Sequence, residues 1–214
     1  MPSKDLTRWR QGLYRLFGAL FLYPDAERLT TLRTVAGELQ QERDFWVDDS
    51  ALSDPFQRLL QALAGLAKGA NVRVEEEYTR LFTVKPAAPP YESFYLDPEG
   101  YTRGWILVQL EREYAEAGLA LSPSLKEPPD HIAVELEFMA FLCHEQARAW
   151  EEDALEVSTQ AKDRQCAFIG QHLGRWFPQF AQRVKDAAPE ALYGVVVEAA
   201  DAFLHHDLEL LRHI

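Results

Sequence analysis

The sequence predicts an all-α protein that folds as a single helical domain. Apolar residues recur at helical spacing in one segment after another, no stretch alternates with the period of two that a strand requires, and most connections are short. The 214 residues are 47% hydrophobic and 26% charged, so the chain can bury a sizeable core. We expect two helical groups, residues 1–118 and 130–214, joined by a Pro-containing hinge at residues 119–129.

The first helix is expected to run from near Leu6 to Tyr23, because an apolar stripe with a helical period passes through the charged residues of this segment. Its basic residues and the apolar run at 16–23 superficially resemble a signal peptide. No small-x-small cleavage site follows, and the run is too short to span a bilayer, so we expect neither a signal peptide nor stable membrane insertion. Pro24 ends the helix, since the residue before a proline is disfavoured in the α region.

Three further segments of the N-terminal group carry helical stripes. The first covers residues 29–42. The second begins at Asp54-Pro55, where a capping side chain precedes a proline at the first helical position, and it ends at Gly69. Residues 72–82 carry apolar side chains on one side and glutamates on the other, which predicts a short helix.

Residues 85–98 are the first substantial non-helical stretch. Their prolines exclude a regular helix, and the chain supplies no sheet that a strand here would join, so we expect an ordered extended loop. A further helix is predicted at residues 102–117, closed by Gly118.

The C-terminal group begins where two adjacent prolines end the hinge. They favour a new helix with Asp130 in its first turn, where a negative charge suits the helix dipole. This central helix is wide-faced and is expected to be mostly buried, and a polar break follows at residues 151–158. The next helical pattern is expected to be interrupted near Pro178, and the last helix opens at Pro189.

The charge balance limits the kinds of partner. There are 34 acidic and 22 basic side chains, a net charge of -12, which argues against nucleic-acid binding and favours a basic partner. Cys143 and Cys166 both lie within helical patterns and lack metal-binding spacing. They are expected to be reduced thiols of a cytoplasmic protein.

A polar cluster stands at the start of the central helix: Glu127, Asp130, His131 and Glu135. The one-turn spacing of the last two suits chelation, but a third metal ligand is missing. Ser93 has no glycine elbow around it and no predicted oxyanion-hole donor. The residues therefore predict no catalytic group, no metal site and no cofactor.

Several interpretations of this cluster stay open. It is a binding surface, a buried polar network that joins the hinge to the helix, or the centre of a helical metal- or nucleotide-dependent hydrolase that uses His131 and its neighbouring carboxylates. A plain helical scaffold with an acidic surface is a further alternative. The aromatic residues Tyr91, Phe94 and Tyr95 either hold the Pro-rich loop on the helices or line a groove.

Two motifs carry a resemblance to a known family. Glu127-Pro128-Pro129-Asp130-His131, followed by Glu135, and the upstream run of residues 89–96 resemble the paired motifs of the TorD/DmsD/NarJ family of cytoplasmic molybdoenzyme chaperones. The similarity extends over nearly the whole chain. One departure is Tyr91-Glu92, where some members carry Trp-Gly, so the branch of the family stays open.

The resemblance implies a TorD-like helical chaperone rather than an enzyme. Such proteins bind the apo catalytic subunit of a DMSO-reductase-type enzyme, often through its twin-arginine leader, and hold back export until the molybdopterin cofactor is inserted. Such a leader has adjacent guanidinium groups beside an apolar segment, so its receptor should offer carboxylates beside an apolar groove. The expected client-binding residues are Tyr91, Glu92, Ser93, Phe94, Tyr95, Glu127, Pro128, Asp130, His131 and Glu135, with Phe138 and Met139 in the groove.

Several properties are left open by the sequence. It does not decide which molybdoenzyme is the client, whether the leader or another segment is bound, or whether the cofactor-insertion machinery is also a partner. Both a monomer and a dimer that swaps helices across the hinge fit the pattern. Guanine-nucleotide binding has been attributed to the family, but this sequence contains no phosphate-binding motif that would support it.

Overall fold

The computed structural model describes residues 4–41, 50–66, 71–120, 122 and 127–213. Within these ranges the regular structure is helical and contains no strand, which confirms the predicted all-α class. The helices are α1 (Lys4–Leu20), α2 (Ala26–Leu39), α3 (Ser50–Ala64), α4 (Asn71–Tyr78), the π-helical turn η2 (Thr79–Thr83), α5 (Glu92–Leu96), α6 (Arg103–Glu116), α7 (Ile132–Glu151), α8 (Leu155–Gln171), α9 (Leu173–Ala187) and α10 (Leu192–His213).

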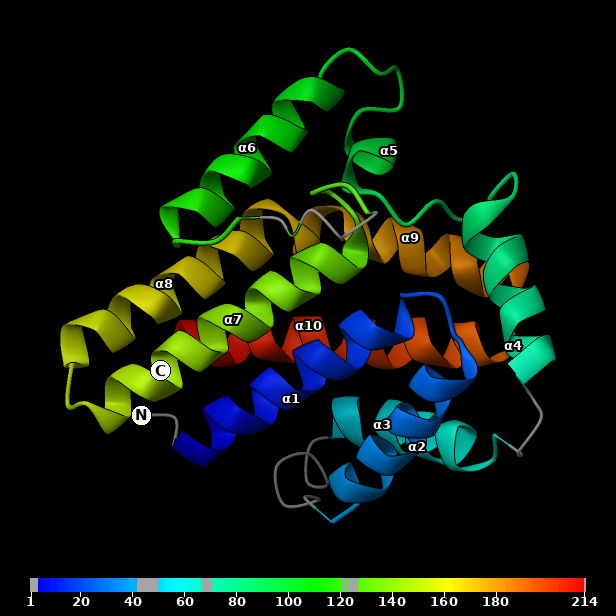
Figure 1. Cartoon of the computed structure of the whole chain (residues 1–214), viewed down its shortest axis with the longest axis horizontal. Helices are drawn as coiled ribbons and strands as arrows, with labels where there is room; N and C mark the ends of the chain where they lie inside the picture. The colour runs from blue at the N-terminus through cyan, green and yellow to red at the C-terminus, as the bar shows by residue number, and fades with distance from the viewer. Residues whose placement is uncertain (1–3, 42–49, 67–70, 121, 123–126, 214) are drawn as a thin grey trace.

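The body of the molecule is formed by helices from both ends of the chain. Figure 1 shows α1, α7 and α8 side by side, with α10 crossing behind them and α2 and α3 packed below. α1 packs extensively on α7, although more than a hundred residues separate them in the sequence. Buried apolar residues of both predicted groups belong to one hydrophobic core.

The two helices α5 and α6 form an arm above this body (Figure 1). α6 buries Leu110 and Tyr114 and leaves Trp105 75% exposed, so only one side of this helix is covered. The arm is attached to the rest of the chain through residues 85–91 and through the connection after Gly118, which ends α6 with a φ of 79°. The arm also packs on the body through its aromatic rings, because Tyr95 stacks on Trp176 of α9 and Tyr114 packs against Phe138 of α7.

A buried polar group, here called the core cluster, connects α1, α7, α8 and α10. The Arg10 guanidinium donates to both carboxylate oxygens of Asp207 and, over 2.6 Å, to Gln165 Oε1, while the Tyr14 hydroxyl donates to Asp207 over 2.5 Å. Gln146 Oε1 accepts from Gln165 Nε2 over 3.0 Å. One cation and one anion thus neutralise each other inside the helical body.

Several sequence-based boundaries differ from the structure, and four of them are informative. The Pro-rich loop is not wholly extended, because residues Glu92–Leu96 make one helical turn. α3 begins at Ser50, ahead of the predicted start, and contains Pro55. α9 continues through Pro178, the sixth residue of the helix, although this proline lacks the N–H that would bond to Gly174. The break in this region lies instead at His172, whose φ and ψ of -119° and -93° are not helical.

The fourth difference is the start of α7. Asp130 does not lie in its first turn; His131 is the N-cap and the helix begins at Ile132. Asp130 is left outside because its carboxylate is bound elsewhere, as described below. The predicted helix end at Gly69 and part of the predicted hinge lie outside the described residues. Among the helices that are described, none has the length and apolar content needed to cross a membrane.

Candidate functional site

The two Pro-rich motifs, almost 40 residues apart in the sequence, meet through their backbones. The Glu92 N–H donates to the Asp130 carbonyl over 2.9 Å, and the Ile132 N–H donates to the Pro90 carbonyl over 3.0 Å. These bonds flank an isolated antiparallel bridge between Tyr91 and His131. The entrance of α7 and the start of α5 are therefore fixed to each other, and the sequence motifs form one structural unit.

Asp130 reinforces this junction with its side chain. Its Oδ2 accepts from the Ser93 hydroxyl over 2.6 Å and from the Ser93 N–H over 3.3 Å. The carboxylate thus meets a backbone donor in the first turn of α5, where N–H groups lack partners within the helix. Its other oxygen, Oδ1, is buried and has no hydrogen-bond partner among the described residues.

His131 is a buried cap of α7. Its Nδ1 accepts from the Ala133 N–H over 3.1 Å, which assigns the ring proton to Nε2, 3.7 Å from Glu127 Oε2. Burial lowers the pKa of His131 to about 4, so the ring is neutral at pH 7. The Tyr91 ring packs edge-on against it at 5.4 Å between centroids. His131 therefore orders the start of α7 and carries no charge.

His172, which the sequence did not single out, holds the arm to the body. Its Nδ1 lies 2.9 Å from Glu92 Oε2 on α5, and its Nε2 lies 3.2 Å from Glu113 Oε1 on α6. Burial opposes the charged form, but the two carboxylates outweigh it and raise the pKa of His172 to about 9. At neutral pH a protonated imidazole thus joins both arm helices to the α8–α9 junction.

Glu135 completes the buried group. Its Oε2 accepts from Trp176 Nε1 over 3.1 Å, and its Oε1 has no partner among the described residues. Burial, and then the negative charge of Glu92, raise the pKa of Glu135 well above its usual value. Its surroundings therefore favour the neutral form of this side chain. We call Glu92, Glu113, Asp130, Glu135 and His172 the arm cluster.

The expectation that a row of carboxylates faces a basic partner is wrong for most of that row. Glu92, Asp130 and Glu135 are at most 2% exposed, and only Glu127 reaches the surface in part. Ser93 and His131 are buried as well. Tyr91, Tyr95 and Pro128 are half-buried, and Phe94 is 42% exposed, with the Arg183 guanidinium 5.4 Å from its ring centroid. The buried residues therefore fit the alternative interpretation, in which they form a buried polar network that joins the hinge to the helix.

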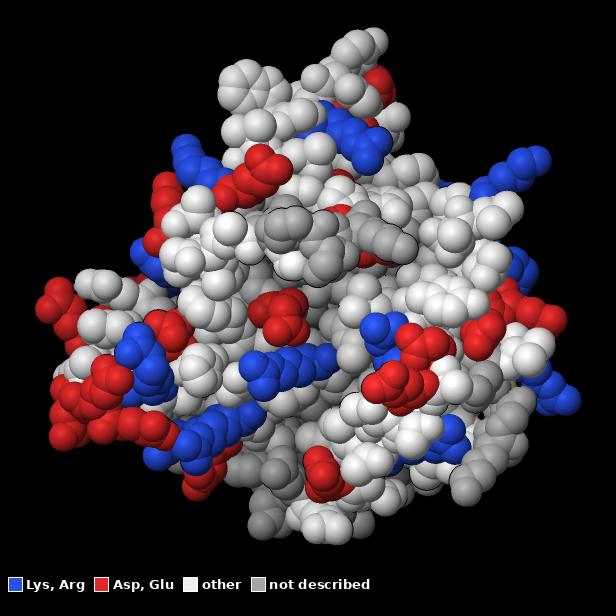
Figure 2. All heavy atoms as spheres, viewed as in Figure 1, with Lys and Arg blue, Asp and Glu red and all other residues white. Residues whose placement is uncertain are grey.

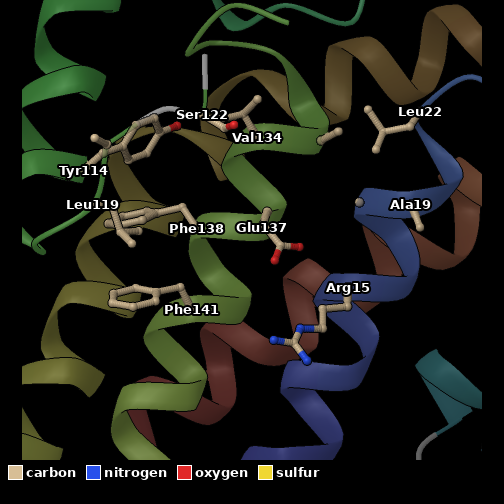
Figure 3. Close-up of a pocket in the computed structure, with 13 residues that line it drawn as sticks. Arg15, Ala19, Leu22, Tyr114, Leu119, Ser122, Val134, Glu137, Phe138 and Phe141 are labelled. Carbon is tan, nitrogen blue, oxygen red and sulfur yellow. The ribbon is translucent and has the colours of Figure 1, made fainter. Parts of the chain in front are cut away.

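An apolar groove lies beside this network, between α1 and α7. It has a volume of about 420 Å³ and is shown in Figure 3. Tyr114 of α6 lines one side, and its hydroxyl donates to the Pro129 carbonyl over 2.9 Å, next to the arm cluster. Phe138 lines this groove, whereas Met139, expected beside it, is fully buried elsewhere in the core. Sequence reasoning missed the contribution of α1, because only tertiary packing brings α1 next to α7.

The described side chains contain no group of three or more His, Cys, Asp or Glu residues placed to hold a metal ion. Cys143 is buried, and burial raises the pKa of its thiol to about 12. Cys166 is also a free thiol, so the predicted reduced state matches the structure for both residues.

Comparisons with known proteins agree over almost the whole chain. The family model described as "Nitrate reductase delta subunit" matches residues 48–182. The chaperone protein TorD of Vibrio cholerae serotype O1 is 28% identical over 99% of this chain and 96% of its own length, and that of Shewanella loihica is 28% identical over 98% of both. The TorD chaperone of Photobacterium profundum is 30% identical over 75% of this chain and 74% of its own.

A solved structure shows the same fold. A putative redox enzyme maturation protein from Archaeoglobus fulgidus superposes with a TM-score of 0.51 over 94% of this chain and 93% of its own, at 20% identity. The family model covers more than half of the chain, and the relatives are chaperones rather than enzymes. The chain therefore belongs to the nitrate reductase delta subunit family, the family of TorD and NarJ, and is a chaperone.

Proposed function

We propose that this protein is a maturation chaperone that binds the apo catalytic subunit of a molybdopterin-dependent oxidoreductase. The observation that carries the proposal is the similarity to TorD chaperones, which is not confined to one motif but extends over 99% of the chain. The finer part of the proposal is that the chaperone binds the basic leader of this subunit in the cytoplasm and releases it for export after the cofactor is inserted.

The ten predicted client-binding residues have two roles in this proposal. Phe94, Tyr91, Tyr95, Glu127 and Pro128 are at least partly accessible and contact the client. An aromatic ring that is held in place at the surface is a typical anchor of a protein interface.

The buried members do not touch the client. Ser93 and Asp130 fix α5 to the entrance of α7, His131 caps α7, and Glu92 and Glu135 belong to the arm cluster. They hold the accessible side chains in position, as supporting residues of a binding site commonly do. The net charge of -12 attracts a basic leader over longer distances.

The first test is capture of a defined client. The apo catalytic subunits of the molybdopterin oxidoreductases from the same genome are tested for co-purification with the chaperone, and the leader peptide of each is titrated into the chaperone by calorimetry at low salt. Binding of both supports the proposal. No capture of the apo-subunit overturns the chaperone–client assignment, and capture without leader binding restricts the contact to another segment of the client.

The second test asks whether Asp130 and His131 maintain the client-binding surface or serve only the fold. Asp130→Ala and His131→Ala should weaken capture while the helical circular dichroism is retained. A general loss of helicity would instead show that these residues serve only the fold. Exposed Val157 of α8 provides a control, because Val157→Ala should change neither capture nor helicity.

A further inference from the structure

The groove between α1 and α7 has the shape and lining of a docking site for an apolar segment. Its volume of about 420 Å³ lies within the usual range of ligand sites. Val134, Phe138 and Phe141 of α7 form one wall, with Ala19 of α1 and Leu22 just beyond it on the other (Figure 3). Two helices side by side leave a seam, and an elongated segment lying along it contacts both.

The groove also contains an accessible carboxylate, which the arm cluster does not offer. Figure 3 shows Glu137 on α7 and Arg15 on α1 extending toward each other from opposite sides of the groove. Both side chains are exposed, and no ion pair joins either of them to a charged residue within the described parts of the chain. Among the described residues that line the groove, Glu137 is the one carboxylate and Arg15 the one cation.

The charges on this face of the molecule favour pairing of a basic partner with a single carboxylate such as Glu137. Figure 2 shows acidic and basic side chains interspersed on the face that contains α1 and α7. A basic partner on this face is therefore directed to individual carboxylates rather than to a uniformly acidic surface.

We infer that this groove receives the apolar segment of the leader and that a basic side chain of the leader pairs with Glu137. The inference rests on the proposed function and adds to it a second contact region beside Phe94. Arg15 extends toward Glu137 without forming an ion pair with it, and its positive charge competes with the basic side chain by repelling an incoming cation. Removing Glu137 and removing Arg15 should therefore change the affinity in opposite directions, a pattern that loss of stability does not produce.

The experiment uses the leader peptide of the client subunit that the capture test identifies, and the same peptide with both arginines replaced by glutamine. By calorimetry at low salt, Glu137→Gln should weaken binding of the native leader by about fivefold, and Arg15→Gln should strengthen it by about the same factor. Glu190→Gln, an exposed carboxylate between α9 and α10, changes the net charge equally and should have less than about a twofold effect. With the glutamine peptide, Glu137→Gln should have no effect.

A steric variant tests the apolar half of the inference. Ala19 is only half-buried, so Ala19→Trp can place its ring in the groove without displacing core residues. It should reduce leader affinity by about tenfold or more, with unchanged circular dichroism.

The outcomes distinguish the inference from the proposed function. If the wild-type protein binds the leader and Glu137→Gln, Arg15→Gln and Ala19→Trp bind it equally well, the groove is not the site, while the chaperone proposal stands. If Arg15→Gln weakens binding as Glu137→Gln does, the competition is wrong and the inference fails. Absence of leader binding by the wild-type protein overturns leader recognition itself, before any variant is compared.

Discussion

The two buried polar clusters of this protein differ in how fully their charges and hydrogen bonds are balanced. In the core cluster, one guanidinium meets one carboxylate, and each oxygen of Asp207 accepts a hydrogen bond. In the arm cluster, two carboxylates, Glu92 and Glu113, contact the His172 imidazole, and Asp130 Oδ1 and Glu135 Oε1 lack partners among the described residues. The arm cluster therefore depends on the proton held by His172, whereas the core cluster pairs a guanidinium with a carboxylate.

The difference follows the roles of the elements that each cluster joins. The core cluster ties together α1, α7, α8 and α10, which form the rigid body. The arm cluster joins α5 and α6 to that body next to the proposed client-binding surface. A polar cluster with incomplete pairing holds its partners less strongly and responds to pH, because partly satisfied buried groups are destabilising. The arm is accordingly the part of the molecule expected to open first.

Breaking the core cluster should have the largest effect. Arg10→Met leaves the Asp207 carboxylate buried without its cation, which should lower the free energy of unfolding by about 3–5 kcal/mol. Urea denaturation followed by circular dichroism measures this change. The double variant Arg10→Met/Asp207→Leu should recover most of the loss, because it removes the unpaired charge. A loss below about 1 kcal/mol in the single variant would contradict the assigned role of the cluster.

The pH dependence of stability above pH 6.5 should come from the arm cluster. The folded-state pKa of His172 is about 9, above its ordinary value of 6.5, so the folded protein binds a proton more tightly than the unfolded chain. Its contribution is complete below pH 6.5 and is lost as pH rises through 9, an effect of about 3 kcal/mol. His172→Gln should lower stability at pH 7 and flatten the curve between pH 6.5 and 9.

His131 provides the internal comparison for that measurement. Its folded-state pKa of about 4 lies below the ordinary 6.5, so its contribution is complete above pH 6.5 and is lost as pH falls through 4. His131→Asn preserves a capping side chain and should remove this acid-side loss. If both variants alter the same pH range, the assignment of opposite charge states to the two histidines is wrong.

The sequence predicted the helices well, because helical spacing of apolar residues reports directly on burial. It also placed the two Pro-rich motifs in one site, and their backbones do meet. It failed on accessibility: Asp130 and Glu135 were expected at a surface, and both are fully buried. An acidic residue within an apolar stripe gives the same sequence pattern whether it is exposed or buried. Only its partners in the folded protein determine which of the two it is.

Other residues were missed because their partners are distant in sequence. His172 lies 80 residues from Glu92 and has no local motif. Arg10 did leave a signal, since it shares the helical stripe of Leu13, Tyr14 and Phe17, where a charge implies a buried partner. Asp207 shows the same signal beside Phe203 and Leu204 of α10. Two opposite charges within apolar stripes would have predicted this pair.

The link between the two Pro-rich motifs should be weaker than either charged cluster. Ser93→Ala removes a donor to Asp130 and should lower the free energy of unfolding by about 1–2 kcal/mol. Amide hydrogen exchange should show the loss of protection mainly in α5 and α6. An equal loss throughout α7 and α10 would show that the arm does not open separately from the body.

The smallest effect on stability is expected at Phe94, where the comparison between fold and function is sharpest. Its ring is 42% exposed and contacts Arg183 and Tyr95, so Phe94→Ala should lower the free energy of unfolding by less than about 1 kcal/mol. Leader affinity should fall by about tenfold, because exposed aromatic anchors contribute strongly to binding. Val157→Ala, at 45% exposure on α8, is the matched control and should change neither quantity. A stability loss at Phe94 as large as that at Ser93, without a change in affinity, would assign this ring to the fold of the arm and remove it from the client surface.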